Sequence, residues 1–293
     1  MYFWMKKASQ FASWMGPRGW RLWGTFLGTL LWWFLPKKRR RILLDNLQTA
    51  LGLNDEEARK MAKANCICMG LLLMEALALP KLNAGNIREW VTLEPEGEEY
   101  LKAAFSEGRG VLLVTAHHGN WEWMGASLAL YGYPTVAVMT PQHNKAANQI
   151  IMDLRSGAQM ILAMRADVRE MVRHLRAGRG VGLLMDQYAP QSTIRTNFFG
   201  RETQCQPGAA VLARMQKAPV VPVFIHRLAN GRHHLTVHPP KYIDETKEKE
   251  AAQEEITKEL MEVIESHIRQ YPEEWFWLHD RWKTRGRERT TTD

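Results

Sequence analysis

From residue 110 onward, short apolar runs alternate with stretches of helical periodicity. Runs of about four to six apolar residues bounded by glycine or polar residues are typical of strands that a parallel sheet buries on both faces. The clearest runs are at 111–115, 135–139, 181–185 and 220–225. This alternation predicts an α/β fold, with a mixed, largely parallel sheet flanked by helices.

The residues before 100 have helical patterns instead. A helical face of apolar residues runs over 39–51, and Asn54 or Asp55 is positioned to cap a following helix. A later stretch is apolar all round and stops at Pro80, as expected of a helix buried against the next domain. We therefore divide the chain into an N-terminal helix at 1–36, a helical segment at 37–100, an α/β domain at 101–285 and a disordered tail at 286–293.

The first of these segments is rich in tryptophan and is followed by a run of bases. Residues 22–35 are fourteen uncharged residues, fewer than the ~20 that a helix needs to cross a bilayer. Tryptophans near both ends of this run suit the headgroup level, and the five bases at 37–41 would hold the following chain on the cytoplasmic side. We expect a membrane-inserted or interfacial anchor helix here. The alternative is a core helix of a soluble domain.

Composition narrows the range of partners. The net charge of +8 suits nucleic acid and anionic lipid equally. Outside the N-terminal segment the bases lack interleaved stacking aromatics, so we expect no nucleic-acid partner. The three cysteines form no disulfide framework, and Cys66 and Cys68 are too close for the common zinc half-site. The histidines at 226–238 lack metal-ligand spacing, so we expect neither a metal nor a cofactor.

Candidate chemistry begins where the apolar run at 111–115 ends. His117 and Glu122 follow it, and a five-residue step inside one helix would splay them by roughly 140°. The pair therefore works only with His117 in a loop and Glu122 in the first turn of a helix. A neutral imidazole there could take the proton of an attacking hydroxyl, while the carboxylate fixes its tautomer. The alternative is a hydrogen-bonded loop histidine and a glutamate that favours the helix dipole.

Nearby polar residues are further candidates. Asn120 could cap the helix or donate to a substrate carbonyl, and His118 is a candidate for substrate contact. Asp186 ends a buried apolar run, where a carboxylate rarely lacks a partner, and could orient an acceptor hydroxyl or hold Arg155; the alternative is a simple strand-end cap. The chain has no G-x-S-x-G motif and no cysteine near a histidine in sequence, so an acyl-enzyme intermediate has little support.

Several motifs occur in a familiar order. They are His-x4-Glu at 117–122, Met185-Asp186-Gln187, Phe198-Phe199-Gly200-Arg201, the stretch 207–223, and the tryptophan-rich segment 272–283. Together they resemble the bacterial lipid A biosynthesis acyltransferase family and its phosphatidylinositol mannoside acyltransferase relatives, over nearly the whole chain. The resemblance implies a glycerolipid-acyltransferase-like fold. It also places at Arg155 an arginine that faces the active site, where it could hold a phosphate or stabilise an oxyanion; the alternative is a surface arginine.

The resemblance implies a membrane-associated acyltransferase at the bacterial inner (cytoplasmic) membrane, with its active domain on the cytoplasmic face. It would move a fatty acyl chain from acyl carrier protein or acyl-CoA to a hydroxyl of a phosphorylated, lipid A-type saccharolipid. His117 would be the general base and Glu122 its orienter, with Asp186 and Arg155 positioning acceptor and charge. The acyl chain would occupy an apolar tunnel between the N-terminal helices and the sheet.

Other interpretations stay open at this point. One keeps the chemistry but uses acyl-CoA and a mannosylated phosphoinositide or another glycolipid. Another is a non-catalytic adaptor that binds anionic lipid through the bases at 37–41. Scattered bases in predicted loops could meet an acidic carrier protein or a phosphorylated sugar, although solvent exposure is the default for each: Lys145, Arg165, Arg195 and Arg201.

Overall fold

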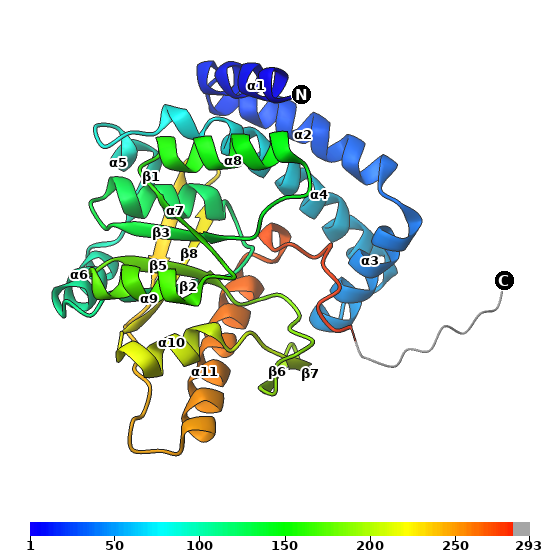
Figure 1. The fold of residues 1–293 in the computed structure, drawn as a ribbon. Coiled ribbons are helices and arrows are strands. Elements are labelled where there is room, and N and C mark those ends of the chain that lie inside the picture. The colour runs from blue at the N-terminus through cyan, green and yellow to red at the C-terminus, as the bar shows by residue number, and fades with distance from the viewer. Residues whose placement is uncertain (284–293) are drawn as a thin grey trace.

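A seven-stranded sheet crosses the middle of the computed structural model, which describes residues 1–283. Its strands are β1 (Val91–Leu93), β2 (Val111–Thr115), β3 (Thr135–Met139), β4 (Ile161–Met164), β5 (Gly180–Leu184), β8 (Val220–Arg227) and β9 (His233–Val237). Their order is β1-β9-β8-β2-β5-β3-β4 (Figure 1). Neighbours are parallel except for β8 and β9, which pair antiparallel. The predicted α/β class with a mixed, mostly parallel sheet is therefore confirmed.

Helices cover both faces of this sheet. They are α6 (Pro95–Ser106), α7 (Trp121–Leu130), α8 (Lys145–Gly157), α9 (Val168–Arg176), α10 (Gly208–Gln216) and α11 (Lys249–Gln270). Figure 1 shows α7 and α8 on one side and α9, α10 and α11 on the other. The five residues of β2 are all buried, and alternate side chains enter the two cores: Leu112 packs with α9 and α10, and Leu113 with α6 and α7. This double burial explains the continuous apolar run of β2.

The remaining two strands lie outside the main sheet. β6 (Arg195–Phe198) and β7 (Arg201–Gln204) form an antiparallel hairpin. Phe199 and Gly200 make the turn between them, both with positive φ. The Phe199 backbone N–H donates to Glu265 on α11, and its ring packs against Trp275. The hairpin is thereby fixed to the tryptophan-rich end of the chain.

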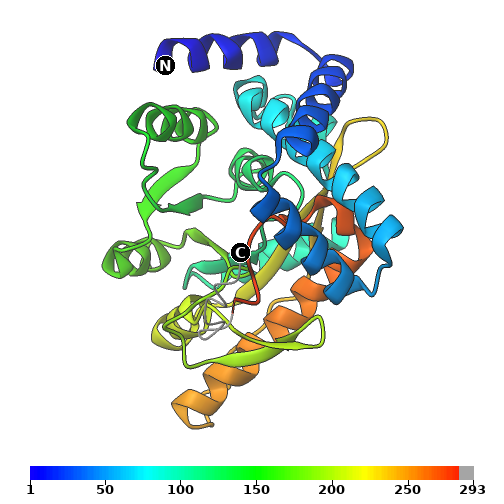
Figure 2. The same ribbon diagram turned by 90° about the vertical axis from the view of Figure 1, so that its right-hand side faces the viewer.

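The N-terminal part is a separate layer of helices. It contains α1 (Tyr2–Trp14), α2 (Pro17–Phe34), α3 (Lys37–Leu51), α4 (Asp55–Leu77), the short 3-10 helix η1 (Leu79–Lys81) and α5 (Ile87–Trp90). Asn54 caps α4 through a capping box with Glu57. Figure 2 shows α1 lying across the top of the molecule and α2 running down from it beside α4. Glycines let α2 and α4 approach closely: a Cβ added at Gly28 would lie 2.4 Å from Ile67 Cα.

Two expectations for this part of the chain need correction. No helix within residues 1–283 has the length and apolar character needed to cross a bilayer. The single anchor helix expected over 1–36 is instead two helices, because the chain turns at Met15 and Gly16 before Pro17 starts α2. The segment 37–100 also contains a strand, β1, which joins the main sheet beside β9. The tail expected at 286–293 lies outside the described residues.

Candidate active site

The carboxyl edge of the sheet gathers the polar residues of the site. His117 lies two residues beyond β2, and Asp186 two residues beyond β5, which is the neighbouring strand. Thr140 follows β3 and Arg165 follows β4 at the same edge. This edge is where parallel α/β sheets place their ligands, because strand ends and the following loops open a crevice there.

His117 is held by Asp186. The Nδ1 atom of His117 lies 2.9 Å from Asp186 Oδ1. The other carboxylate oxygen, Oδ2, accepts from the His117 backbone N–H at 2.9 Å and from the Trp275 indole N–H at 2.8 Å. Since the carboxylate can only accept, Nδ1 carries the proton of the neutral imidazole and Nε2 keeps its lone pair. The pair is therefore set up for a base acting through Nε2.

Charge and burial tune this pair in opposite directions. Burial alone would raise the pKa of the Asp186 carboxyl, but the adjacent His117 and the two other donors lower it to about 2. Burial alone would lower the pKa of His117, yet the Asp186 carboxylate outweighs it and raises the pKa above its usual value. Asp186 is 3% exposed and the His117 side chain 23% exposed, so the imidazole can be reached from solvent while its partner cannot.

Glu122 does not orient His117, contrary to expectation. Its carboxylate forms two hydrogen bonds with Arg155, from Nε at 2.8 Å and from Nη2 at 2.7 Å. Asp186 is the partner of His117 because β2 and β5 are adjacent, so residues two positions beyond each strand end meet. Glu122 lies in the first turn of α7 and faces Arg155 on α8. Burial opposes ionisation of Arg155, but Glu122 raises the pKa of its guanidinium overall.

Asn120 and His118 do not line the cavity beside His117. The Asn120 side chain is fully buried, where it accepts from the Trp123 backbone N–H as the cap of α7 and donates to Glu75. His118 is 1% exposed, and its Nε2 lies 2.8 Å from the Tyr271 carbonyl. Burial lowers the pKa of His118 to about 4. The structure thus gives both residues supporting positions, and Asn120 takes the capping role that the sequence offered as one alternative.

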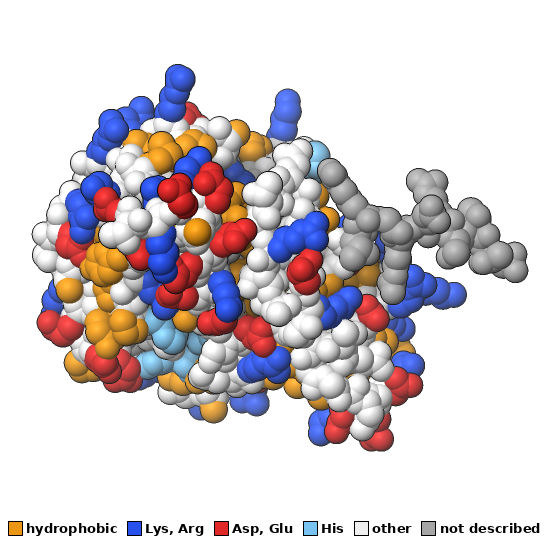
Figure 3. All heavy atoms as spheres, turned by 90° about the horizontal axis from the view of Figure 1, so that it is seen from below, with side chains coloured by type: hydrophobic (Ala, Val, Ile, Leu, Met, Phe, Trp, Pro, Cys, Tyr) orange, Lys and Arg blue, Asp and Glu red, His pale blue; other side chains and the backbone are white. Residues whose placement is uncertain are grey.

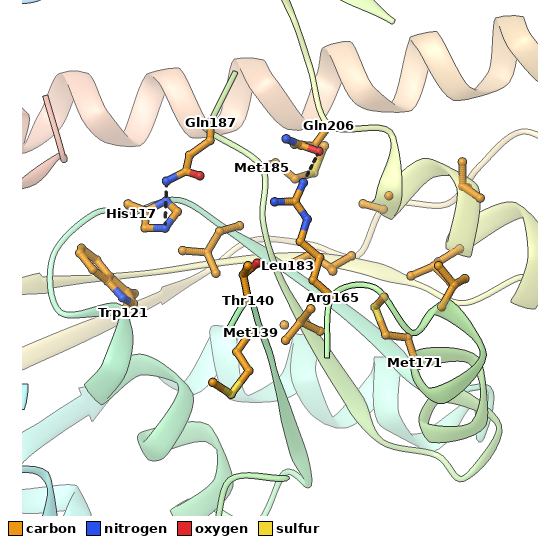
Figure 4. A pocket seen from close by; sticks show the side chains of 18 of the residues that line it. His117, Trp121, Met139, Thr140, Arg165, Met171, Leu183, Met185, Gln187 and Gln206 are labelled. Carbon is orange, nitrogen blue, oxygen red and sulfur yellow. Dashed lines mark hydrogen bonds between the residues drawn. The ribbon is translucent and has the colours of Figure 1, made fainter. Parts of the chain in front are cut away.

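A cavity of about 420 Å³ opens beside His117 (Figure 4). Its wall is mostly apolar, with Met139, Leu183 and Met171 among the lining side chains. A smaller hollow of about 50 Å³ adjoins it, sharing Trp121 and Arg155 in its lining, and extends under α7 to Gly125 and Met160. The cavity therefore lies between the sheet edge and the helices α7 to α10. The apolar tunnel was expected between the N-terminal helices and the sheet, and no residue before His117 lines this cavity.

The contacts that the tryptophan-rich C-terminal segment, residues 272–283, makes in the site were not predicted from the sequence. The Phe276 backbone N–H donates to the His117 carbonyl at 2.9 Å, and the Gly119 backbone N–H donates to the Glu274 carbonyl at 3.1 Å. This segment therefore runs along the loop after β2 and brings Trp275 to Asp186. Its tryptophan-rich motif signalled a special segment but not this contact. Gln187 was also missed as a neighbour of His117: its amide nitrogen lies 3.5 Å from His117 Nε2 (Figure 4).

A buried ion pair contacts the loop that follows β2. Glu75 on α4 forms two hydrogen bonds with Arg227, at 2.6 and 2.8 Å, and also accepts from Asn120. The Arg227 backbone N–H in turn donates to Glu274. This network joins the cap of α7 to the C-terminal segment. Within residues 1–283, no three histidine, cysteine or acidic side chains gather in a way that could hold a metal ion.

The chain is similar to proteins of known family. A family model described as bacterial lipid A biosynthesis acyltransferase matches residues 4–284. The chain is 30% identical over 268 residues to the lipid A biosynthesis lauroyltransferase of Escherichia coli (strain K12), covering 89% of this chain and 84% of that protein. It is 28% identical to the lipid A biosynthesis palmitoleoyltransferase of the same organism, with the same coverage. It is also 25% identical to the phosphatidylinositol mannoside acyltransferase of Mycolicibacterium smegmatis (strain ATCC 700084 / mc(2)155), over 71% of this chain and 67% of that protein.

Proposed function

Since the chain belongs to the bacterial lipid A biosynthesis acyltransferase family and is an O-acyltransferase, we propose that it transfers a fatty acyl chain from a thioester to a hydroxyl of a lipid A-type glycolipid, with His117 as the general base. The observation that carries the proposal is the His117–Asp186 pair, whose unprotonated Nε2 lies at a mostly apolar cavity. A base needs its lone pair within reach of the acceptor hydroxyl, and an acyl chain needs apolar lining.

The transfer is a direct displacement. His117 Nε2 takes the proton of the acceptor hydroxyl as that oxygen bonds to the thioester carbonyl carbon. The tetrahedral intermediate then expels the sulfur, and the imidazolium returns the proton to the departing thiolate. Asp186 stabilises the imidazolium between these two events. No serine or cysteine among the described residues lines the cavity, which supports direct transfer over an acyl-enzyme.

We assign the acyl chain to the apolar end of the cavity and its narrow extension. Met124, Leu128 and Met160 line the extension, so a straight chain entering from His117 would run under α7. The proposed donor is acyl carrier protein, with acyl-CoA as the alternative. The match to phosphatidylinositol mannoside acyltransferases supports a mannosylated phosphoinositide as the second candidate acceptor.

The experiment that tests this function offers labelled acyl carrier protein and acyl-CoA in parallel, each with a lipid A precursor and a phosphatidylinositol mannoside. We expect product on the lipid A precursor, and His117→Ala should lower the rate about 10²- to 10⁴-fold. His143→Ala is the matched control, because that histidine is exposed and does not line the cavity. Product on the mannolipid alone would favour the second candidate. Full activity of His117→Ala would refute the proposed base.

We also propose that the protein acts at the surface of an anionic membrane, lying on it through α1 and α2. These helices expose large apolar side chains, which are Phe3, Trp4, Phe11, Trp14, Leu22, Trp23, Phe26, Leu30, Trp33 and Phe34. Residues 1–44 include nine lysines and arginines and no acidic residue. Aromatic side chains flanked by bases are typical of helices that lie in the headgroup region. Binding to the cytoplasmic face of the inner membrane would follow from this attraction to anionic lipid.

The opposite side of the molecule contrasts with this face. Figure 3, viewed from the side of α11, shows acidic and basic side chains intermixed, with hydrophobic groups in separate spots. Flotation with anionic and with zwitterionic vesicles tests the proposal: Trp14→Ser/Trp33→Ser should reduce the bound fraction, and anionic lipid should bind more. The matched control is Met215→Ser/Tyr242→Ser, which removes exposed apolar groups elsewhere. Equal flotation of the two double variants would exclude α1 and α2 as the membrane face.

A further inference from the structure

The charges that line the main cavity are unbalanced. Three ionisable side chains line it, His117, Arg155 and Arg165, and no carboxylate of the described chain does so. Two of the three already have acidic partners, because Asp186 holds His117 and Glu122 holds Arg155. Arg165 is left as the cation without an acidic partner within 4.0 Å among the described residues.

The position of Arg165 is fixed, although its charge is not compensated. Its backbone N–H donates to the Met139 carbonyl at 2.9 Å, which extends the pairing of β4 with β3 by one residue. Its guanidinium donates to Gln206 Oε1 at 2.8 Å. Figure 4 shows the Arg165 side chain pointing toward Gln206, apart from His117.

The acidic residues nearest to Arg165 in sequence are used elsewhere. Asp167 caps α9 by accepting from the Glu170 backbone N–H at 2.8 Å. Glu170 accepts from Arg173 at 3.2 Å. Arg165 is exposed and lines the cavity, and the uncharged polar residues that line it as well are Thr140, Gln142, Gln187 and Gln206.

We propose that Arg165 binds a phosphate group of the substrate and, with Gln206, positions it at the cavity mouth while the reacting carbonyl lies at His117. This inference rests on the proposed acyl transfer and deepens it. A planar guanidinium with free donors matches two phosphate oxygens at once. The phosphate has two possible sources with the same chemistry, the glycolipid acceptor or the phosphopantetheine arm of the thioester donor. Arg155 is the weaker candidate, because Glu122 neutralises its charge and occupies the Nε–Nη2 edge of its guanidinium.

The test compares Arg165→Gln with wild type on substrates that carry or lack phosphate. The acceptor is used intact and after enzymatic dephosphorylation, and the donor is used as acyl carrier protein, acyl-CoA or a phosphate-free acyl-N-acetylcysteamine thioester. We expect KM for the phosphate-bearing partner to rise about tenfold to a hundredfold, with kcat little changed. Arg165→Lys should give an intermediate KM, since it keeps the charge but loses the two-point geometry. Arg169→Gln is the matched control, because Arg169 is exposed and does not line the cavity.

Comparing the substrates with and without phosphate identifies whether the acceptor or the donor supplies the phosphate. A KM increase that disappears with the dephosphorylated acceptor assigns Arg165 to the acceptor, and one that disappears with the N-acetylcysteamine thioester assigns it to the donor. An increase of equal size with and without phosphate, or no increase with any substrate, overturns the inference.

A binding measurement separates this inference from the proposed function. Calorimetric titration with a deacylated, phosphorylated disaccharide and with 4′-phosphopantetheine requires no turnover. If wild type transfers no acyl chain, the proposed function fails, and weaker binding of either ligand to Arg165→Gln still supports the phosphate site. Equal affinity of wild type and Arg165→Gln for both ligands would overturn it.

Discussion

Asp186→Asn is the substitution that tests the catalytic pair most directly. Oδ2 of Asp186 accepts two hydrogen bonds, from the His117 backbone and the Trp275 indole, and Oδ1 accepts one from His117 Nδ1. The side-chain amide of an asparagine has only one oxygen, which can take the position of either Oδ1 or Oδ2. Placing the amide oxygen toward the two donors satisfies both, and turns the amide N–H₂ toward His117 Nδ1. The reverse orientation leaves two buried donors facing N–H groups, at about 1–3 kcal/mol each.

The favoured orientation of the asparagine inverts the imidazole. Nδ1 becomes the acceptor, so the proton of the neutral ring moves to Nε2 and the lone pair leaves the cavity. In a serine protease triad the equivalent change lowers kcat about 10⁴-fold, or roughly 5 kcal/mol of transition-state stabilisation. Because the acceptor hydroxyl here needs the same base, we expect a kcat loss of about 10³- to 10⁴-fold with a small change in KM.

Rate and tautomer should be measured on the same variants. Nitrogen-15 chemical shifts of labelled histidine report which ring nitrogen of His117 is protonated, and kcat comes from the transfer assay. Asp186→Asn should show a protonated Nε2, whereas Glu122→Gln should keep the proton on Nδ1. An Asp186→Asn enzyme with near wild-type kcat, or a Glu122→Gln enzyme with the inverted tautomer, would refute this assignment of roles.

Three further predictions follow from other parts of the structure. Gly125→Leu should shift donor preference toward shorter acyl chains in a chain-length series, because it fills the hollow beside Met160 and each excluded methylene costs about 0.8 kcal/mol, or roughly fourfold. Gly28→Val should destabilise the fold by about 1–3 kcal/mol in urea unfolding, since its Cβ meets the α4 backbone, whereas Gly19→Ala meets only Met15 and should be milder. Burial lowers the pKa of His118 to about 4 and of His267 to about 2. At these two positions the unfolded chain thus binds more protons below pH ~6.5, so their contribution to stability should be complete above that pH and fall toward pH 4, by about 3 kcal/mol from His118 alone. A urea midpoint that stays constant from pH 7 to 4.5 would contradict this. His267→Phe should make the urea midpoint depend less steeply on pH.

The strand ends of the site were predictable, but not the partners that meet there. Polar residues directly after buried runs identified His117 and Asp186 as candidates. The order of strands along the chain does not reveal that β5 lies beside β2, because two strands and three helices separate them in sequence. Glu122 was chosen as the partner of His117 from its proximity in sequence. The actual partner is 69 residues away.

His117 and His118 are adjacent in sequence but lie in opposite environments. His117 and His118 are indistinguishable by residue type, yet one lines the cavity and the other packs against His267 in the core. The local loop conformation and the C-terminal segment decide this, and neither is encoded in the apolar pattern. The break between α1 and α2 had a visible signal in Gly16 and Pro17, which the tryptophan-rich run beyond them obscured.

In the proposed mechanism, the Glu122–Arg155 pair allows one cavity to contain both a general base and an anion-binding arginine. Arg155 by itself lowers the pKa of His117, and Glu122 raises it, so the pair leaves Asp186 in control of the base. The uncompensated cation is Arg165, on the loop after β4 and away from Nε2. Glu122→Gln would free the Arg155 charge beside the base. We therefore expect it to lower the pKa of His117 and to move the acid limb of the kcat profile to lower pH, while the Nδ1–H tautomer is retained. A limb that moves to higher pH would mean that Glu122 screens no charge from His117.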